Sequence, residues 1–251
     1  MRAVLPVLGL LGIVGVWWLA TIVFGIEPLL VPSPADVVRS FLELPGYLLE
    51  QTLITLWEAV SGFGLSIVIG VPLALLIVGS SVLERMFYPL LVALNAVPKV
   101  AIAPIVVVWF GFGVSSKVLM VVLVCVFPIV ISTASGMKST PAELVELFRS
   151  LDATRTHEFF KLRLWHALPQ VFVGLKVSIT LAVIGAVIGE FVGANAGLGY
   201  VIMLSGASAD TSLAFAAMGL LAIVSVALFY ALTWAERKLV PWAEEHRQDQ
   251  S

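Results

Sequence analysis

The sequence predicts an all-α integral membrane protein with about six transmembrane helices, and three observations support this fold class. The 251 residues are 60% hydrophobic and only 12% charged, with a mean hydropathy of +1.07. Water-soluble domains carry about 25% charged residues, so this chain has too little polar surface to face water on all sides. It also contains several nearly uncharged stretches of the roughly 20 residues that cross the hydrocarbon. Finally, one dense group of charges separates the fourth stretch from the fifth.

Composition excludes several other classes. A net charge of −2 and an isoelectric point of about 5.9 do not indicate a nucleic-acid partner. The single cysteine, Cys125, excludes an internal disulfide, and its apolar surroundings in the sequence predict a small buried hydrophobe. His157, His166 and His246 lack the spacing of metal ligands. We therefore expect no metal site, no cofactor and no catalytic residues.

The first 51 residues predict one membrane helix followed by an amphipathic segment. Ala3–Ile26 carries no charge, is too long for a signal-peptide core and lacks a small-x-small cleavage site. The following stretch, Glu27–Gln51, holds four acidic residues and several prolines. Ser33 can cap a short helix that begins at Pro34. The apolar face of that helix predicts a position on the membrane surface.

Three further helices are expected in the middle of the chain. The expected segments are a helix at Ala59–Leu83, a short loop at Glu84–Arg85, a helix at Met86–Ser116 whose residues 111–116 form a turn, and a helix at Val118–Met137. Pro98 and Pro104 predict that the second of these helices is broken or kinked, because proline removes a backbone donor.

The charged segment, defined here as Lys138–His166, differs from the rest of the chain. It contains nine acidic and basic residues, more than any other stretch of similar length. Thr140 and Pro141 predict a helix start with a hydroxyl cap. The apolar residues that follow at helical spacing are Leu144, Leu147, Phe148 and Leu151. Asp152 can form the turn that ends this helix, and Thr154 can cap a second short helix.

The remaining segments complete the domain organisation. The expected segments are a fifth helix at Pro169–Phe191, a glycine-rich and partly re-entrant connection at Gly193–Asp210, a sixth helix at Thr211–Ala235 and a polar tail at Glu236–Ser251. We expect residues 1–50 to form the first helix and the external amphipathic segment, residues 51–235 the transmembrane domain that includes 138–166, and residues 236–251 a cytoplasmic tail.

Basic residues set the orientation, because cytoplasmic loops carry an excess of lysine and arginine. With both termini in the cytoplasm, only Arg39 and Lys117 lie outside. The ten basic residues on the cytoplasmic side are then Arg2, Arg85, Lys138, Arg149, Arg155, Lys161, Arg163, Arg237, Lys238 and Arg247. The charged segment is therefore predicted to face the cytoplasm, where its helices can dock on a partner and pass motion to the membrane helices on either side.

The charged segment also resembles a known family. Residues Glu146–Ala153 are similar to the E-A-A-x-x-x-G motif of ABC importer permeases, and Leu164–Pro169 is similar to its closing L-P-x-A-L-P. Asp152 stands where the motif usually has glycine, and Trp165 where it usually has proline. Asp tolerates a left-handed turn better than most residues, so the turn is expected to persist.

Other parts of the chain, in the same order as in the family, resemble its nitrate/sulfonate/taurine-type branch. They are Val31–Pro34, Thr52–Phe63, Gly70–Leu73, Trp109–Lys117, Gly174–Lys176, Glu190, Gly197–Gly199 and Glu236–Trp242. The resemblance covers nearly the whole chain and implies the type I importer permease fold.

The resemblance implies one subunit of a larger importer. Its partners would be two ABC ATPase subunits, a substrate-binding protein and a second permease copy, in the membrane of a prokaryote and with no nucleic acid. The chain lacks the G-x-x-x-x-G-K-[ST] phosphate loop, so ATP would be bound by the partner ATPase. The implied solute is nitrate, a sulfonate, taurine or a similar small metabolite. The residues implied to contact the ATPase are Glu146, Leu147, Phe148, Leu151, Asp152 and Ala153. The alternative is a secondary transporter or channel that works without ATP.

Four polar residues in the membrane helices are candidates for the pathway or its gate: Asn95, Lys99, Thr180 and Glu190. Intramembrane ionisable residues are functional candidates by default. Lys99 can instead satisfy the carbonyl groups freed by the broken helix, and Glu190 can pair with a neighbouring helix, which we favour. Asn95 and Thr180 can equally join helices to each other.

Overall fold

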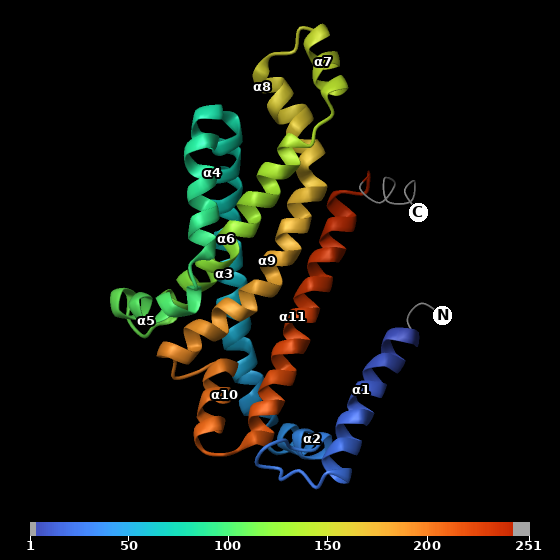
Figure 1. Ribbon diagram of the computed structural model, residues 1–251, viewed down its shortest axis with the longest axis vertical. Helices are drawn as coiled ribbons and strands as arrows, with labels where there is room; N and C mark the ends of the chain where they lie inside the picture. The colour runs from blue at the N-terminus through green and yellow to red at the C-terminus, as the bar shows by residue number, and fades with distance from the viewer. Residues whose placement is uncertain (1–3, 243–251) are drawn as a thin grey trace.

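The computed structural model describes residues 4–242, which form eleven α-helices and one π-helix (Figure 1). In chain order these are α1 (Val4–Val23), α2 (Pro34–Glu43), α3 (Pro45–Gly79), α4 (Ser81–Ala96), α5 (Lys99–Phe110), α6 (Val114–Lys138), α7 (Ala142–Ser150), α8 (Arg155–His157), the π-helix η1 (Glu158–Arg163), α9 (Leu164–Gly193), α10 (Leu198–Ala207) and α11 (Thr211–Leu239). Arg2, His246 and Arg247 lie outside the described residues.

Membrane-spanning length is met by four helices, α3, α6, the continuous helix Arg155–Gly193 and α11. A fifth span results if α4 and α5, which meet at an angle of 94°, cross the membrane together. Two apolar helices are shorter than this length among the described residues: the stretch Leu11–Val23 of α1, and α10 (Leu198–Ala207). The all-helical membrane fold is therefore confirmed, and the expected number of about six requires α1 as a span.

The short helix predicted after Ser33 is confirmed as α2. The Ser33 hydroxyl accepts a hydrogen bond from the Asp36 backbone N–H, and the Asp36 carboxylate accepts one from the Ser33 backbone N–H at 3.1 Å. Hydrogen bonds from the Ser33 side chain and backbone stabilise the charged carboxylate and lower the pKa of Asp36. This reciprocal capping fixes α2 where it crosses the end of the bundle opposite α7 (Figure 1).

Two expected boundaries are wrong. The second long helix begins at Pro45 rather than Ala59, because Pro45 occupies the first helical position and Glu50 and Glu58 lie within the helix. Glu84 and Arg85 do not form a loop but belong to α4, which begins after Ser80, whose hydroxyl accepts from the Leu83 backbone N–H. The divisions expected after residues 50 and 235 consequently fall inside α3 and α11.

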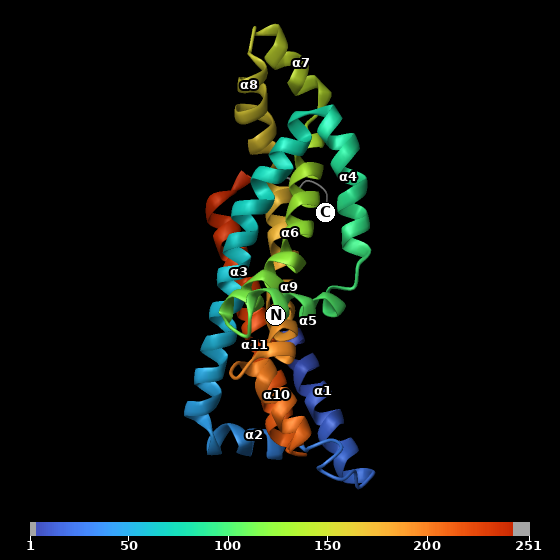
Figure 2. The ribbon, with the colours of Figure 1, turned by 90° about the vertical axis from the view of Figure 1, so that its left-hand side faces the viewer.

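The break expected at Pro98 is confirmed. Helix α4 ends at Ala96, and α5 begins at Lys99 with Pro98 as its N-cap. The glycine turn after α5 is shorter than expected, since α6 begins at Val114. Gly111 supplies the left-handed backbone of that turn, with a φ of +81°. Helix α4 contains no buried residue and stands apart from α3 and α6 when the molecule is viewed from the side (Figure 2).

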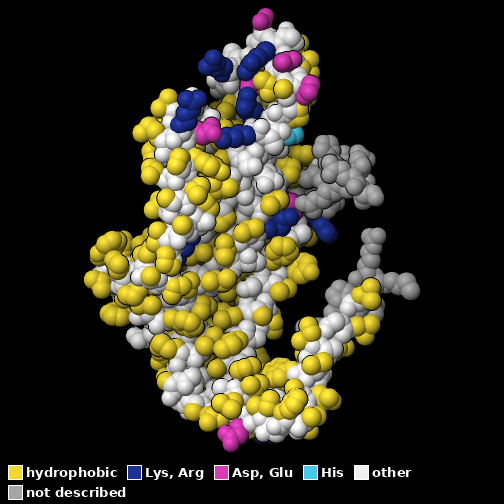
Figure 3. All heavy atoms as spheres, viewed as in Figure 1, with side chains coloured by type: hydrophobic (Ala, Val, Ile, Leu, Met, Phe, Trp, Pro, Cys, Tyr) yellow, Lys and Arg dark blue, Asp and Glu magenta, His cyan; other side chains and the backbone are white. Residues whose placement is uncertain are grey.

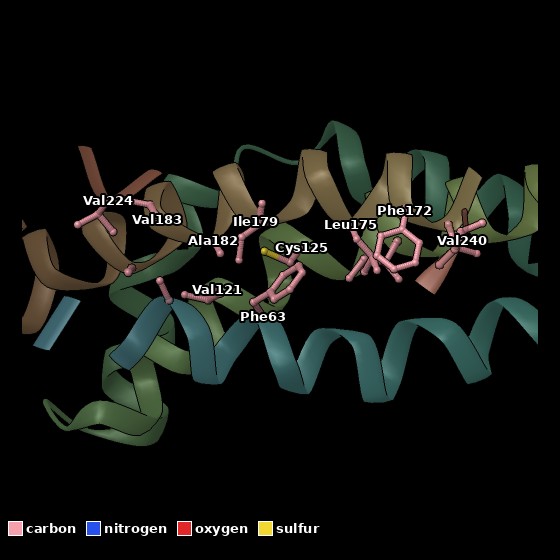
Figure 4. Close-up of a cluster of buried hydrophobic side chains, with 14 of the residues drawn as sticks. Phe63, Val121, Cys125, Phe172, Leu175, Ile179, Ala182, Val183, Val224 and Val240 are labelled. Carbon is pink, nitrogen blue, oxygen red and sulfur yellow. The ribbon is translucent and has the colours of Figure 1, made fainter. Parts of the chain in front are cut away.

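The core lies where α3, α6 and α9 pack together, with contributions from α11 (Figure 4). Phe63, Val121, Ile179 and Ala182 are among its buried side chains. Cys125 is completely buried there, as expected, and its Sγ donates to the Ser178 carbonyl oxygen at 3.1 Å. Apolar side chains cover much of the body on the face shown in Figure 3, whereas charged side chains gather at the end that carries α7 and α8.

Close contact between α6 and α9 depends on glycine. A methyl group at Gly185 would lie 2.9 Å from the Cα of Val121, and one at Gly189 would lie 2.9 Å from the Cα of Lys117. Both distances are too short for a carbon–carbon contact, and the atoms met belong to backbone. Small residues at such positions allow membrane helices to approach closely.

We expect Gly185→Ala to destabilise the protein by about 1–3 kcal/mol, because the added methyl must displace the α6 backbone. Gly64→Ala is the matched control on α3, since a methyl there meets no atom within 4 Å. Thermal unfolding of the purified protein in detergent measures the difference. Equal midpoints for the two variants would contradict this account of the packing.

Candidate functional site

The charged segment projects from one end of the molecule. Helix α6 rises to Lys138, α7 and α8 follow, and the chain returns through η1 into α9 (Figure 1). The Lys138 ammonium contacts the Glu84 carboxylate at the start of α4, so an ion pair lies at the base of the segment. The described part of the chain contains no group of three or more His, Cys, Asp or Glu residues that could hold a metal ion.

The predicted hydroxyl cap of α7 is wrong. The Thr140 hydroxyl donates to the Met137 carbonyl oxygen at 3.3 Å and so satisfies the last turn of α6 instead. Helix α7 begins at Ala142 after Pro141, with no side-chain hydrogen bond at its N-cap. Helix α7 therefore has no strong N-cap of its own, and its position depends on the ends of the long helices α6 and α9.

The apolar stripe of α7 faces away from the protein. Val145 is the only residue of α7 that is buried among those described, whereas Leu147 is 53% exposed and Leu151 is 72% exposed. Glu146 is also exposed, and Phe148 and Ala153 are half-buried. The six residues implied to contact an ATPase therefore lie together, on one short helix and the turn that follows it.

Asp152 forms the turn expected of it. Its φ is +54°, in the left-handed region. The Ala153 N–H donates to the Phe148 carbonyl and the Asp152 N–H donates to the Arg149 carbonyl, both at 3.1 Å. This pair of bonds is the Schellman motif that ends many helices. The turn thus persists with aspartate in the place where the family motif has glycine.

We expect Asp152→Val to lower stability by about 1–2 kcal/mol, because a β-branched residue tolerates the left-handed conformation poorly. Asp152→Gly is the matched variant, and it should unfold at the same or a higher temperature than the unmodified protein. Uptake assays and thermal unfolding of both variants test this prediction. A glycine variant less stable than the valine variant would show that the aspartate side chain, and not the backbone, matters here.

Glu158 is a structural residue that the sequence did not single out. It is 8% exposed, and its carboxylate accepts from Arg163 Nη2 at 2.6 Å and from Arg149 Nε at 3.4 Å. The Arg149 ion pair joins the end of α7 to η1, whereas the Arg163 ion pair lies within η1. The expected second short helix is not separate, because α8, η1 and α9 are continuous. Its cap is confirmed, since Thr154 Oγ1 accepts from the His157 N–H.

The pathway candidates do not form one group. Lys99 Nζ donates to the Asn95 carbonyl oxygen at 2.8 Å and to Asn95 Oδ1 at 2.5 Å. This geometry favours the interpretation in which Lys99 satisfies the broken helix. Thr180 is half-buried and its hydroxyl donates to the Val177 carbonyl oxygen within its own helix.

Glu190 is fully buried and organises the turn between α9 and α10. Its carboxylate accepts from Thr55 Oγ1 at 2.7 Å and from the Gly199 N–H at 2.5 Å. Thr55 Oγ1 also accepts from the Leu198 N–H. The first backbone donors of α10 are thereby satisfied by side chains of α3 and α9. This arrangement supports the interpretation that Glu190 pairs with a neighbouring helix.

A second acid lies beside Glu190. The carboxyl group of Glu58 on α3 adjoins that of Glu190 and lies 3.0 Å from Lys117 Nζ on α6. Glu58 was not singled out in the sequence, so this pair of buried acids is known from the structure alone. We define the buried polar cluster as Gln51, Thr55, Glu58, Lys117 and Glu190, all of them buried.

The buried polar cluster was largely missed because Lys117 looked like a loop residue and Glu58 like the end of a polar segment. A local signal existed on α3, since residues 51, 55 and 58 fall on one helical face. Gln51 Oε1 accepts from the Gly197 N–H at 2.6 Å, so this face holds the start of α10. The cluster joins α3, α6, α9 and α10 through charges and hydrogen bonds rather than through apolar packing.

Comparison with known proteins identifies relatives of the chain. Residues 66–243 match the family model described as "Binding-protein-dependent transport system inner membrane component". The formylaminopyrimidine transport permease protein ThiX of Halalkalibacterium halodurans is 37% identical, over 97% of this chain and 98% of that protein. The putative aliphatic sulfonates transport permease protein SsuC of Escherichia coli is 32% identical, over 92% of this chain and 89% of that protein.

A solved structure is similar in fold. The match is to a chain in the inward facing MetNI methionine ABC transporter, with a TM-score of 0.67 and 20% sequence identity. The similarity covers 79% of this chain and 97% of the matched chain.

Proposed function

The chain belongs to the family of binding-protein-dependent transport system inner membrane components, and from this premise we propose that two copies of it form the membrane pathway of an ATP-driven importer. It is a multi-pass inner membrane protein and a permease subunit, not an ATPase. Family membership implies ATPase and binding-protein partners and sets aside the alternative of a transporter that works without ATP.

The exposed stripe of α7 supports the proposed contact with the ATPase, and this observation carries the proposal. Leu147 and Leu151 point away from the protein at the end of a charged projection, where an uncovered apolar surface would be unfavourable. Glu146, Asp152 and Ala153 border the same surface, and Phe148 anchors its base. An ATPase groove that receives this stripe would bury it.

The proposed topology places this projection in the cytoplasm and Arg39 outside. The start of α1 and the end of α11 point toward the same side as α7, as expected if both termini are cytoplasmic (Figure 1). The excess of basic residues in the charged segment supports the same orientation. Protease added to inside-out vesicles should cleave within residues 138–166, whereas protease added to intact cells should not. Cleavage in intact cells would contradict the topology.

We expect the solute to be a small metabolite delivered by an external binding protein. Nitrate, sulfonates and taurine are the classes implied by sequence motifs, but the identity to ThiX exceeds the identity to SsuC. This difference favours a nitrogen heterocycle, of the kind named for ThiX, as the solute.

The partner binding protein tests the solute class directly. Its thermal unfolding should shift upward with a formylaminopyrimidine and not with nitrate, taurine or an alkyl sulfonate. The same compound should then be taken up by cells that express the whole importer. A shift with the sulfonates alone would overturn the assignment while leaving the permease role intact.

A further inference from the structure

Two adjoining cavities lie between the charged segment and the facing ends of α3 and α4. The arginine cavity, of about 270 Å³, is lined by Arg149, Arg155, Arg163 and Glu158. The apolar groove, of about 700 Å³, has walls that include Pro72, Leu75, Leu76, Leu83 and Phe160. Gly79, Arg155 and Phe159 line both spaces, so the two cavities meet at these residues.

The arginine cavity has a charge excess that the protein does not neutralise. Three guanidinium groups face one carboxylate, which leaves two positive charges in excess. Glu158 pairs with Arg149 and Arg163, whereas Arg155 has no ion-pair partner among the described residues. A guanidinium presents planar donors that match the oxygens of a phosphate or carboxylate. The cavity is therefore suited to an anion.

The apolar groove has the opposite character and runs toward the membrane. Its walls come from the last two turns of α3, the start of α4, and the residues of α8 and η1. Leu76 is 64% exposed and Phe160 is 51% exposed. Pro72 and Gly79 are seven residues apart on α3, a rise of about 10 Å. A ligand that fills both spaces must join an anionic group to a hydrocarbon chain.

We propose that the arginine cavity and the apolar groove form one binding site for an anionic phospholipid of the cytoplasmic leaflet. The phosphate would lie against Arg155 in the arginine cavity, and an acyl chain would occupy the apolar groove. Basic pockets between membrane helices on the cytoplasmic side are suited to such headgroups. The leaflet assignment depends on the proposed topology, but lipid binding itself is measured without transport, so the two can fail separately.

Native mass spectrometry of the purified transporter tests the site, with phosphatidylglycerol and phosphatidylcholine as probes. The unmodified protein should retain phosphatidylglycerol in preference to phosphatidylcholine. Arg155→Gln should weaken phosphatidylglycerol binding about tenfold, since loss of one charged contact is worth roughly that factor. Lys161→Gln is the matched control, because Lys161 is an exposed cation of η1 that lines neither cavity. Equal binding by both variants would overturn the proposal.

A second variant blocks the junction of the two cavities without touching a charge. A Cβ atom added at Gly79 would have no neighbouring atom within 4 Å, so the leucine side chain of Gly79→Leu can occupy the shared space without displacing the backbone. It should reduce phosphatidylglycerol binding, whereas Gly64→Leu, at an equally open position on α3, should not. Binding of inorganic phosphate that depends on Arg155, with no retained lipid, would overturn the lipid assignment. So would preferential retention of phosphatidylcholine.

Discussion

Replacing Leu147 with aspartate should reduce solute uptake at least about a hundredfold, which corresponds to roughly 2.8 kcal/mol of lost coupling. Reversing a conformational population from 1:99 requires about 5.5 kcal/mol, and exposed ion pairs contribute only about 0–1 kcal/mol each. The proposed ATPase contact therefore needs its apolar residues, and Leu147 is the central one on α7. An aspartate there would place an unpaired charge in the contact. Glu146→Ala removes an exposed charge from the same contact and is expected to reduce uptake by a smaller factor, up to about fivefold.

The measurement is uptake by cells together with the amount of protein in the membrane. Both variants should insert normally, because Leu147 and Glu146 are exposed and contribute little to the core. Ala142→Asp is the matched control, since it adds the same charge at the first residue of α7, where a helix favours an acid. Normal uptake by the Leu147 and Glu146 variants would refute the proposed contact, and so would an equal loss in the control.

Lys117→Met should destabilise the protein by about 3–5 kcal/mol, because it leaves the Glu58 carboxylate buried without its partner. The side chain of Lys117 is 7% exposed and that of Glu58 is 0% exposed, so water cannot replace the ion pair. Glu190 also adjoins Glu58, and Lys117 is the ion-pair partner of Glu58 among the described residues. Thermal unfolding in detergent should show a midpoint lower by roughly 10 °C.

The double variant Glu58→Gln/Lys117→Met distinguishes a charge effect from a packing effect. Replacing both members of a buried pair is often neutral, so the double variant should recover most of the lost stability. Lys99→Met is the control for removing a lysine from the apolar part of the chain, because the Lys99 ammonium in the described structure is hydrogen-bonded to Asn95 and not to an acidic residue. A double variant no more stable than Lys117→Met would contradict the role assigned to the ion pair.

Local chemistry made part of the fold predictable. Ser33 followed by Pro34 is a self-contained helix start, and the structure contains it without change. Pro98 ends a helix by removing a backbone donor, whatever surrounds it. Asp152 can adopt a left-handed turn in isolation, so its conformation also followed from the sequence. In each case the interacting atoms are a few residues apart.

Interactions between distant residues could not be predicted in the same way. Glu58 and Lys117 are on different helices, and nothing in the sequence near either residue identifies the other. The Thr140 hydroxyl could either cap the start of α7 or donate to a carbonyl group of α6. In the structure it donates to the Met137 carbonyl oxygen of α6. The continuity of α8, η1 and α9 was also missed, because the charges of residues 155–163 resemble a loop and the ion pairs of Glu158 cannot be read from the sequence.

The uninterrupted helix Arg155–Gly193 has a mechanical consequence. It contains 39 residues, a length of about 58 Å at the helical rise, with the Glu158 ion pairs near one end and Glu190 near the other. The π-helix η1 and Pro169, which lies inside α9, both fall near the α7 end of this helix, and long helices bend at π-helical turns and prolines. Movement at α7 would therefore bend the helix near Pro169. The part of α9 beyond Pro169 contains no further proline and would move as one body up to Glu190 and α10.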